Sequence, residues 1–231
     1  MASLHTRASR WLMGLVFLCH LLLCSSYRIG EAKTPGPVDS SPGEWSFGVC
    51  NPSGLQGKAM LLSGIDADLI AVSETHLTSV SKTMFRRSLK AHSSYKHVVT
   101  GAPLPPRSQG SDAGSYSGVA VVSKGPSRAL CSHWPPDLYE TGRVQITSSL
   151  INNCWISGGT IYGYPQGKYH VNAQSRTEDM LDCMVEHLTV FASGPRFLCG
   201  DWNFDPHQLR AIQQLIDKGW QEVQTLEFLR T

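Results

Sequence analysis

A short stretch near the C-terminal end, residues 197–206 (FLCGDWNFDP), constrains the fold more than any other part of the sequence. Its first three residues are apolar and β-prone, and Gly200 ends this run so that Asp201 and Asn203 follow directly. A buried strand that ends in polar side chains is typical of α/β proteins, which bind ligands at the carboxyl edge of the sheet. We therefore take Asp201 and Asn203 as candidate site residues.

The composition is that of a globular protein. The chain has 231 residues, 41% hydrophobic and 16% charged, which is enough to bury one sizeable core. The formal charge of +2 by itself implies neither nucleic acid nor an anionic membrane as a partner. The charges are unevenly distributed, however, because residues 76–110 contain no acid but several Lys and Arg. This basic stretch predicts contact with a phosphate backbone through Arg86, Arg87 and Lys90, and a solvated helix face is the alternative.

The first 44 residues are predicted to lie outside the folded domain. Residues 1–26 contain two arginines, then a mostly apolar run, then two serines, which is the order of a secretory signal. The apolar run is too short to predict a membrane span. Residues 27–44 are rich in Pro and Gly and are predicted to be a linker, so that the domain covers residues 45–231.

The rest of the chain alternates between strand and helix patterns. Strands joined through a helix are expected to lie parallel, and strands joined by short turns are expected to form hairpins. The pattern therefore predicts an α/β fold with two mixed sheets packed face to face and helices outside them. Besides the strand at residue 197, strands are predicted at 45–50, 68–73, 95–100, 118–123, 143–151, 154–162 and 220–226, and helices at 56–62, 79–90, 172–192 and 206–218.

Polar side chains follow four of the predicted strands. An ionised carboxylate directly after a buried strand is costly unless it is paired or binds a metal. Carboxylate and amide oxygens suit Mg²⁺, which keeps water ligands and reaches substrate phosphates. Singly, each residue has a plain structural role as a turn former, helix cap or core tyrosine, and it is their joint occurrence that favours a site. The set is Asn51, Glu74, Tyr162, Asp201 and Asn203.

These residues lie in motifs that resemble those of the endonuclease/exonuclease/phosphatase superfamily. The branch that the chain most resembles is the apurinic-endonuclease-like domain of non-LTR retrotransposons, of the type found in dinoflagellate genomes. The resemblance begins near residue 45 and implies a four-layer α/β sandwich of two mixed β-sheets flanked by helices, with Mg²⁺- or Mn²⁺-dependent hydrolysis of DNA phosphodiesters. The motifs are, in order, 45–51 (WSFGVCN), 71–76 (AVSETH), 117–123 (SGVAVVS), 161–165 (IYGYP) and 200–203 (GDWN).

The resemblance also assigns a role to each candidate residue. Glu74 is expected to ligate the metal ion, and Asn51 to support the metal and the phosphate. Asp201 is expected to orient or deprotonate the attacking water, and Asn203 to hold a phosphate oxygen. Tyr162 is expected to contact the phosphate.

The sequence departs from the family pattern at its end. A Ser-Asp-His motif closes the family's domain, and none follows Asn203 here. The resemblance therefore predicts a domain that is incomplete at its C-terminus, lacks the last strands of one sheet, and has impaired catalysis. His207 follows soon afterwards but is predicted to begin a helix, so it does not take the histidine's role. Tyr164 replaces Tyr162 if the alignment is shifted.

Three functions stay open on the sequence alone. The leading hypothesis is a metal-dependent retroelement DNA endonuclease, which is expected in the nucleus. The second is a phosphatase or phosphodiesterase of the same fold, which a secretory signal would suit. If residues 1–26 are a signal, the chain is expected to meet a membrane only transiently. The third is a non-catalytic remnant that binds nucleic acid. No protein partner is predicted.

Overall fold

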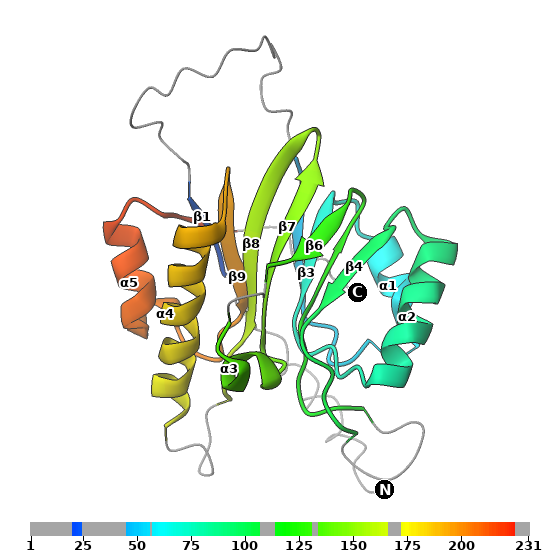
Figure 1. The fold of residues 1–231 in the computed structure, drawn as a ribbon, viewed down its shortest axis with the longest axis horizontal. Helices are drawn as coiled ribbons and strands as arrows, with labels where there is room; N and C mark the ends of the chain where they lie inside the picture. Colours follow the sequence, from blue (N-terminus) through cyan, green and yellow to red (C-terminus); the bar gives the residue numbers. More distant parts are fainter. Residues whose placement is uncertain are drawn as a thin grey trace, which may run out of the picture.

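Two mixed β-sheets pack face to face, and helices cover the outer face of each (Figure 1). This arrangement confirms the predicted fold class. No helix in the described part of the chain is long and apolar enough to cross a bilayer. The computed structural model describes most of the chain, namely residues 20–24, 45–55, 57–106, 114–130, 134–165 and 172–224.

The smaller sheet has four strands in the order β2-β3-β5-β4. Strands β2 and β3 are parallel because helix α1 connects them, and the other pairs are antiparallel. Helix α2 follows β3, and Thr78 caps its start in a capping box with Ser81. The elements are β2 (Phe47–Cys50), α1 (Ala59–Ser63), β3 (Leu69–Val72), α2 (Ser79–His92), β4 (His97–Thr100) and β5 (Ala120–Ser123).

The larger sheet has six strands in the order β10-β1-β9-β8-β7-β6. Strands β8 and β9 are parallel because α4 connects them, and every other pair in this sheet is antiparallel. Helices α4 and α5 cover its outer face (Figure 1). The elements are β1 (His20–Cys24), β6 (Ser127–Ala129), α3 (Pro136–Glu140), β7 (Val144–Ile151), β8 (Cys154–Tyr162), α4 (Ala173–Phe191), β9 (Arg196–Asp201), the 3₁₀ turn η1 (Pro206–Gln208), α5 (Arg210–Asp217) and β10 (Gln221–Gln224).

Strand β1 comes from the N-terminal segment. It lies between β9 and β10 and is antiparallel to both, with Leu22 opposite Leu198 and Glu222. The sequence predicted a signal over residues 1–26 and a domain that begins at residue 45, so this strand is an addition to the predicted domain. The rest of the signal segment, the linker, and everything after residue 224 lie outside the described residues. The signal, the linker and the missing last strands therefore stay predictions.

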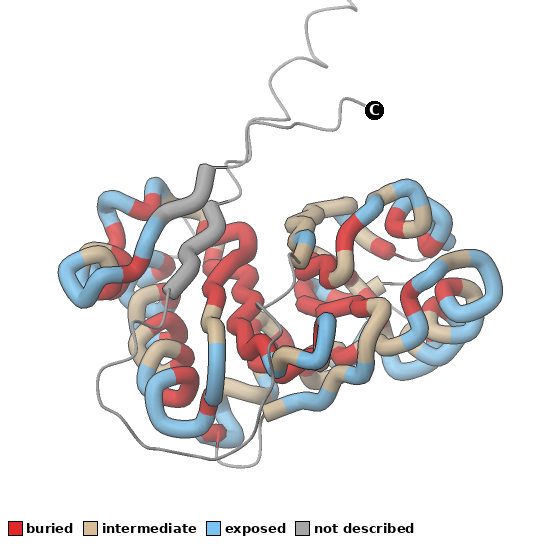
Figure 2. The backbone as a smooth tube through the Cα atoms, turned by 90° about the horizontal axis from the view of Figure 1, so that it is seen from above, coloured by how far each residue is buried: buried red, intermediate tan, exposed pale blue. Residues whose placement is uncertain are grey.

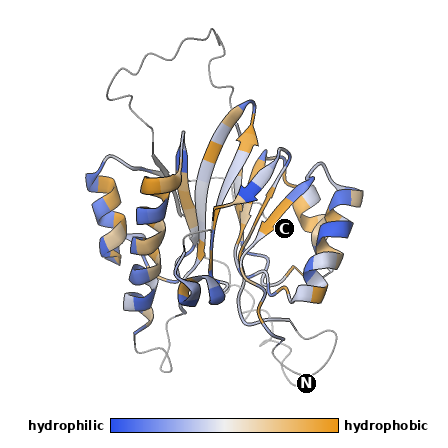
Figure 3. Ribbon diagram, viewed as in Figure 1, coloured by the Kyte–Doolittle hydropathy of each residue, from blue (hydrophilic) through white to orange (hydrophobic). Residues whose placement is uncertain are grey.

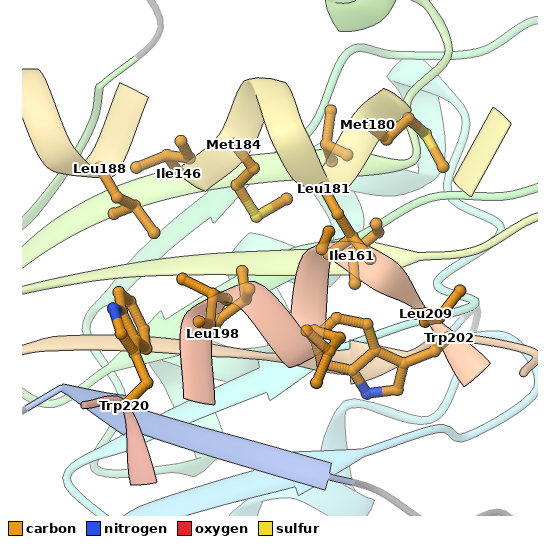
Figure 4. Close-up of a cluster of buried hydrophobic side chains, with 14 of the residues drawn as sticks. Ile146, Ile161, Met180, Leu181, Met184, Leu188, Leu198, Trp202, Leu209 and Trp220 are labelled. Atoms are coloured by element: carbon orange, nitrogen blue, oxygen red, sulfur yellow. The ribbon is translucent and has the colours of Figure 1, made fainter. Parts of the chain in front are cut away.

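Alternation along the strands divides the core into three apolar layers. Phe197 and Cys199 of β9 face the other sheet, whereas Leu198 faces the helices. Figure 4 shows this second layer, in which Met184 and Leu188 of α4 pack over the larger sheet. The third layer lies between the smaller sheet and α1 and α2. Buried residues accordingly concentrate in the strands (Figure 2), and the helices carry hydrophilic residues on their outer sides (Figure 3).

Candidate active site

The two parallel strand pairs bring their carboxyl ends together at one edge of the sandwich. Asn51 directly follows β2, and Glu74 lies two residues beyond β3. Tyr162 and Asp201 are the last residues of β8 and β9 and stand opposite each other in the ladder. Four of the five polar side chains that the sequence predicted at strand ends are therefore at the same edge.

The alternation of each strand determines where these side chains point. Asn51 continues the face of β2 that lies between the sheets, and Asp201 continues the corresponding face of β9. Trp202, one residue later, enters the opposite layer beneath the helices, where it is 1% exposed (Figure 4). Asn51 and Asp201 thus approach each other from opposite sheets.

Two hydrogen bonds join the sheets at this edge. The Nδ2 atom of Asn51 donates to Oδ2 of Asp201 at 2.8 Å. The hydroxyl of Tyr162 donates to Oε1 of Glu74 at 2.6 Å. Each bond pairs a residue of the smaller sheet with one of the larger sheet, so all four residues form one cluster.

Asn203 completes the cluster through a left-handed turn. Its φ of 58° turns the chain back, so that its backbone N–H donates to Oδ1 of Asp201 at 3.1 Å and its Nδ2 to the carbonyl of Gly163 at 2.9 Å. Glu74 has a φ of 52°, which is unusual for a residue that is neither Gly nor Asn. Left-handed backbone of this kind costs about 1 kcal/mol or more and is often retained at functional sites.

Burial governs the electrostatics of the cluster. Asp201 is 5% exposed, and burial raises the pKa of its carboxyl group, as does the charge of Glu74, while the hydrogen bonds from Asn203 and Asn51 oppose this shift. Burial also raises the pKa of Tyr162, and the hydrogen bond to Glu74 adds to the effect. Tyr162 therefore stays a neutral donor, and Asp201 moves towards the range in which a carboxylate is an effective base.

The donor set fits a hard divalent cation. Glu74 has a second oxygen, Oε2, that accepts no hydrogen bond from any described residue, and Oδ1 of Asn51 accepts only from the backbone N–H of Ser53, at 3.1 Å. Among the described residues there is no cluster of three or more His, Cys, Asp or Glu side chains. Mg²⁺ typically binds through one or two protein carboxylates and keeps several waters. Glu74 and Asn51 are the residues that would hold such an ion.

The predicted substrate-binding residues of the basic stretch do not join this cluster. Arg86, Arg87 and Lys90 lie two or more turns along α2, which runs over the outer face of the smaller sheet. The Nη2 atom of Arg86 donates to the carbonyl of Val98, so this arginine links α2 to β4. Arg87 and Lys90 are exposed. Their role in substrate binding stays a prediction.

Arg143 is a site residue that the sequence did not single out. It precedes β7, and its Nη1 donates to the carbonyls of Tyr162 at 3.3 Å and Gly163 at 3.0 Å. Its guanidinium carbon lies 4.8 Å from the centre of the Tyr162 ring. The only signal in the sequence is a single basic residue between a Thr-Gly turn and an alternating strand.

The geometry also separates the alternatives named for two candidate residues. Tyr162, not Tyr164, contacts Glu74, and the Tyr164 hydroxyl instead accepts from Arg176. His207 lies on η1, where its backbone N–H donates to Asp205 at 3.0 Å. The position of His207 on this 3₁₀ turn agrees with the expectation that it does not take the role of the family's histidine.

Comparisons with known proteins point to one family. A sequence model of the Endonuclease/Exonuclease/phosphatase family matches residues 58–227. Curated protein sequences give no match. An AP endonuclease from Archaeoglobus fulgidus is similar in structure over 76% of this chain and 71% of that chain, with a TM-score of 0.53 and 14% identity. At this identity the similarity shows the fold alone.

Two further solved structures are more distantly similar. Sphingomyelinase C from Streptomyces griseocarneus matches over 76% of this chain and 69% of that chain, with a TM-score of 0.46 and 12% identity. The AP endonuclease LMAP from Leishmania major matches over 62% of this chain and 47% of that chain, with a TM-score of 0.43 and 19% identity. Both likenesses are too weak to bear on function.

Proposed function

The chain belongs to the Endonuclease/Exonuclease/phosphatase family, and we propose that it is a metal-dependent phosphodiester hydrolase that cuts DNA, of the kind that non-LTR retrotransposons encode. One observation carries the proposal: the Asn51–Asp201 and Tyr162–Glu74 hydrogen bonds gather an all-oxygen donor set and a buried carboxylate at one edge. Enzymes of this family generally depend on divalent metal ions, and Mg²⁺ or Mn²⁺ is the proposed cofactor.

Each residue of the cluster has a proposed role. A bound metal ion would polarise the phosphoryl oxygen and offset charge on the leaving oxygen. Glu74 and Asn51 would hold that ion. Asp201, fixed by hydrogen bonds from Asn51 and Asn203, would orient the attacking water and accept its proton. Tyr162 would contact the phosphate, and Asn203 would hold a phosphate oxygen.

DNA is the proposed partner, and the nucleus is the proposed site of action. An AP endonuclease is among the proteins that share the fold, which supports DNA as the substrate. A secretory signal in residues 1–26 would instead send the protein out of the cell. Imaging of the full chain with a C-terminal fluorescent tag separates the two locations.

A non-catalytic nucleic-acid-binding domain is the second candidate. The observation that favours it is that His207, the histidine of the described segment after Asn203, lies on η1 and not in the cluster. A histidine that donates to the phosphate stabilises charge in the transition state, and the loss of one such donor lowers rates by about 10² to 10³-fold.

Nicking of supercoiled plasmid separates the two candidates. We expect the purified full chain to nick DNA with Mg²⁺, and expect EDTA or Glu74→Ala to abolish the reaction. Glu186→Ala is the matched control, because Glu186 is an exposed glutamate on α4. Nicking that persists at the same rate in EDTA and in the Glu74→Ala variant would contradict the proposal. DNA binding without nicking would support the second candidate instead.

A further inference from the structure

A row of alternating aromatic and cationic side chains leads away from Glu74. Tyr162 donates to Glu74, and the guanidinium carbon of Arg143 lies 4.8 Å from the Tyr162 ring centre and 4.5 Å from that of Tyr164. The guanidinium carbon of Arg176 lies 3.8 Å from the Tyr164 ring centre, and its Nη2 donates to the Tyr164 hydroxyl at 2.7 Å. These contacts connect the carboxylate to the first turn of α4.

No carboxylate of a described residue forms an ion pair with either guanidinium in this row. The ion pairs within the described part of the chain involve Lys124 and Arg210, and none involves Arg143 or Arg176. Burial is the main cause that lowers the pKa of Arg143; Tyr162 and Tyr164 oppose this shift, and the nearby charge of Arg176 adds to it. Two cations held together without an acid repel each other, and a bound anion would relieve that repulsion.

Both guanidiniums also have unused hydrogen-bond donors. A guanidinium carries five N–H groups. Arg143 uses only Nη1, which donates to the carbonyls of Tyr162 and Gly163, and Arg176 uses only Nη2. Arg143 is half-buried and Arg176 is exposed. They are therefore available to an anion that approaches from outside.

We propose that Arg143 and Arg176 form a second phosphate-binding subsite, which holds a phosphate next to the scissile one in a polynucleotide strand. The inference rests on the proposed function, because it takes the scissile phosphate to lie at Glu74. A DNA strand carries one phosphate for about every 3.4 Å of helix axis, so a strand bound at Glu74 brings further phosphates past the row. A single phosphodiester, such as a lipid headgroup, leaves the subsite empty. The subsite therefore selects polynucleotides.

Binding in EDTA tests the subsite without any catalysis. The probe is a fluorescein-labelled oligonucleotide, and its anisotropy with the full chain is measured over a range of salt concentrations. We expect Arg176→Gln to weaken binding about 10-fold and to reduce the salt slope by about 1, because one phosphate contact is lost. Arg210→Gln is the matched control: Arg210 is an exposed arginine on α5 that is paired with Asp182, and wild-type binding is expected.

A second arm locates the contact and measures its dependence on phosphate number. Arg87→Gln removes an exposed arginine of the basic stretch on α2, and its effect should be smaller than that of Arg176→Gln. Competition with thymidine oligonucleotides that contain one or two phosphodiesters should show tighter binding of the longer one, and Arg176→Gln should erase this preference. Arg143→Lys, which keeps the charge but loses the planar stack, should show an intermediate loss.

The outcomes separate this inference from the proposed function. Equal affinities and salt slopes for Arg176→Gln and Arg210→Gln would overturn the subsite, and so would a larger loss for Arg87→Gln or equal competition by the two oligonucleotides. Nicking that depends on Glu74, together with unchanged binding by Arg176→Gln, would reject the subsite and leave the nuclease. Binding that depends on Arg176, without any nicking, would reject the nuclease and leave the subsite.

Discussion

The two parallel strand pairs supply the site in different ways. In the larger sheet, Tyr162 and Asp201 are themselves the last residues of their strands, are opposite each other in the ladder, and are 7% and 5% exposed. In the smaller sheet, Asn51 and Glu74 come after their strands and are only half-buried. Strand pairing and core packing thus fix the position of Asp201, whereas the backbone of the loops after β2 and β3 positions Asn51 and Glu74, the proposed metal-binding half of the site.

The loop after β3 is held by its own backbone hydrogen bonds. The carbonyl of Glu74 accepts from the N–H of Gly54 at 2.8 Å, and the N–H of Thr75 donates to the carbonyl of Gly118 at 3.0 Å. The loop is therefore fastened on both sides, to the segment after β2 and to the segment before β5. The difference between the halves predicts that changes in the β8–β9 pair affect stability and chemistry together, whereas changes at Glu74 affect chemistry alone.

The largest expected effect comes from neutralising either acid. We expect Asp201→Asn and Glu74→Gln each to lower kcat/KM for plasmid nicking by about 10³-fold. Raising the Mg²⁺ concentration should partly restore Glu74→Gln, because the lost group binds metal, and should not restore Asp201→Asn, because the lost group is a base. Nicking rates over a Mg²⁺ titration measure this difference. Equal restoration of both variants would show that the two halves share one role.

Gly200→Ala should give the largest loss of stability. Gly200 has a φ of +144°, and a Cβ there would overlap the carbonyl oxygen of Ile161 on the neighbouring strand. We expect the free energy of unfolding to fall by about 3 kcal/mol or more, measured by urea denaturation. Gly57→Ala is the control: its φ is +69° but no atom lies within 4 Å of the added Cβ, so about 1 kcal/mol is expected. Equal losses would show that the β8–β9 pair is not tightly packed at this end.

Leu22→Pro tests whether pairing by β1 stabilises the parallel strands β8 and β9. Leu22 lies between β9 and β10, and a proline there cannot donate to a ladder on either side. We expect a loss of about 2 kcal/mol in the free energy of unfolding. Leu22→Ala keeps the backbone N–H and isolates that contribution. If Leu22→Pro and Leu22→Ala have equal free energies of unfolding in urea, the stability of the β8–β9 pair does not depend on pairing by β1.

Much of the fold was predictable because the pattern of each strand is local. Strand β8 occupies residues 154–162 as predicted, and β7 begins within one residue of its prediction. The positions of Asn51, Glu74, Tyr162 and Asp201 at strand ends were predictable for the same reason, while their roles stay predictions. In a parallel pair, residues that follow the two strands lie at the same edge of the sheet. Connections through a helix made the β2–β3 and β8–β9 pairs parallel.

What the sequence could not predict depends on contacts between distant segments. The stack of Arg143 on Tyr162 joins the residue before β7 to the last residue of β8, and no spacing in the sequence marks it. The pairing of β1 likewise depends on a sheet formed far along the chain. The start of the last helix was also predicted wrongly at Pro206: a 3₁₀ turn ends at Gln208, and α5 begins only after Leu209, which is extended and fully buried. Tertiary burial of that side chain overrides the local helix signal.

Tyr95→Phe should give the smallest effect, and it tests the far end of the smaller sheet. The buried Tyr95 hydroxyl donates to the carbonyl of Ile65 and accepts from the N–H of Ala67 at 3.3 Å, just before β3, at the opposite end of that strand from Glu74. Its loss leaves the Ile65 carbonyl without its donor and the Ala67 N–H without its acceptor, so we expect a loss of about 1 kcal/mol in the free energy of unfolding and unchanged kcat/KM for nicking.

The pH dependence of that loss has a definite sign. Burial raises the pKa of Tyr95 in the folded chain, so above about pH 10 the unfolded chain ionises first and the wild type loses stability relative to Tyr95→Phe. The difference between the two proteins in the free energy of unfolding should therefore shrink as the pH rises past that value.

A large fall in kcat/KM for Tyr95→Phe would show that the far end of β3 is coupled to Glu74. The loop backbone alone would then not position the metal-binding half of the site.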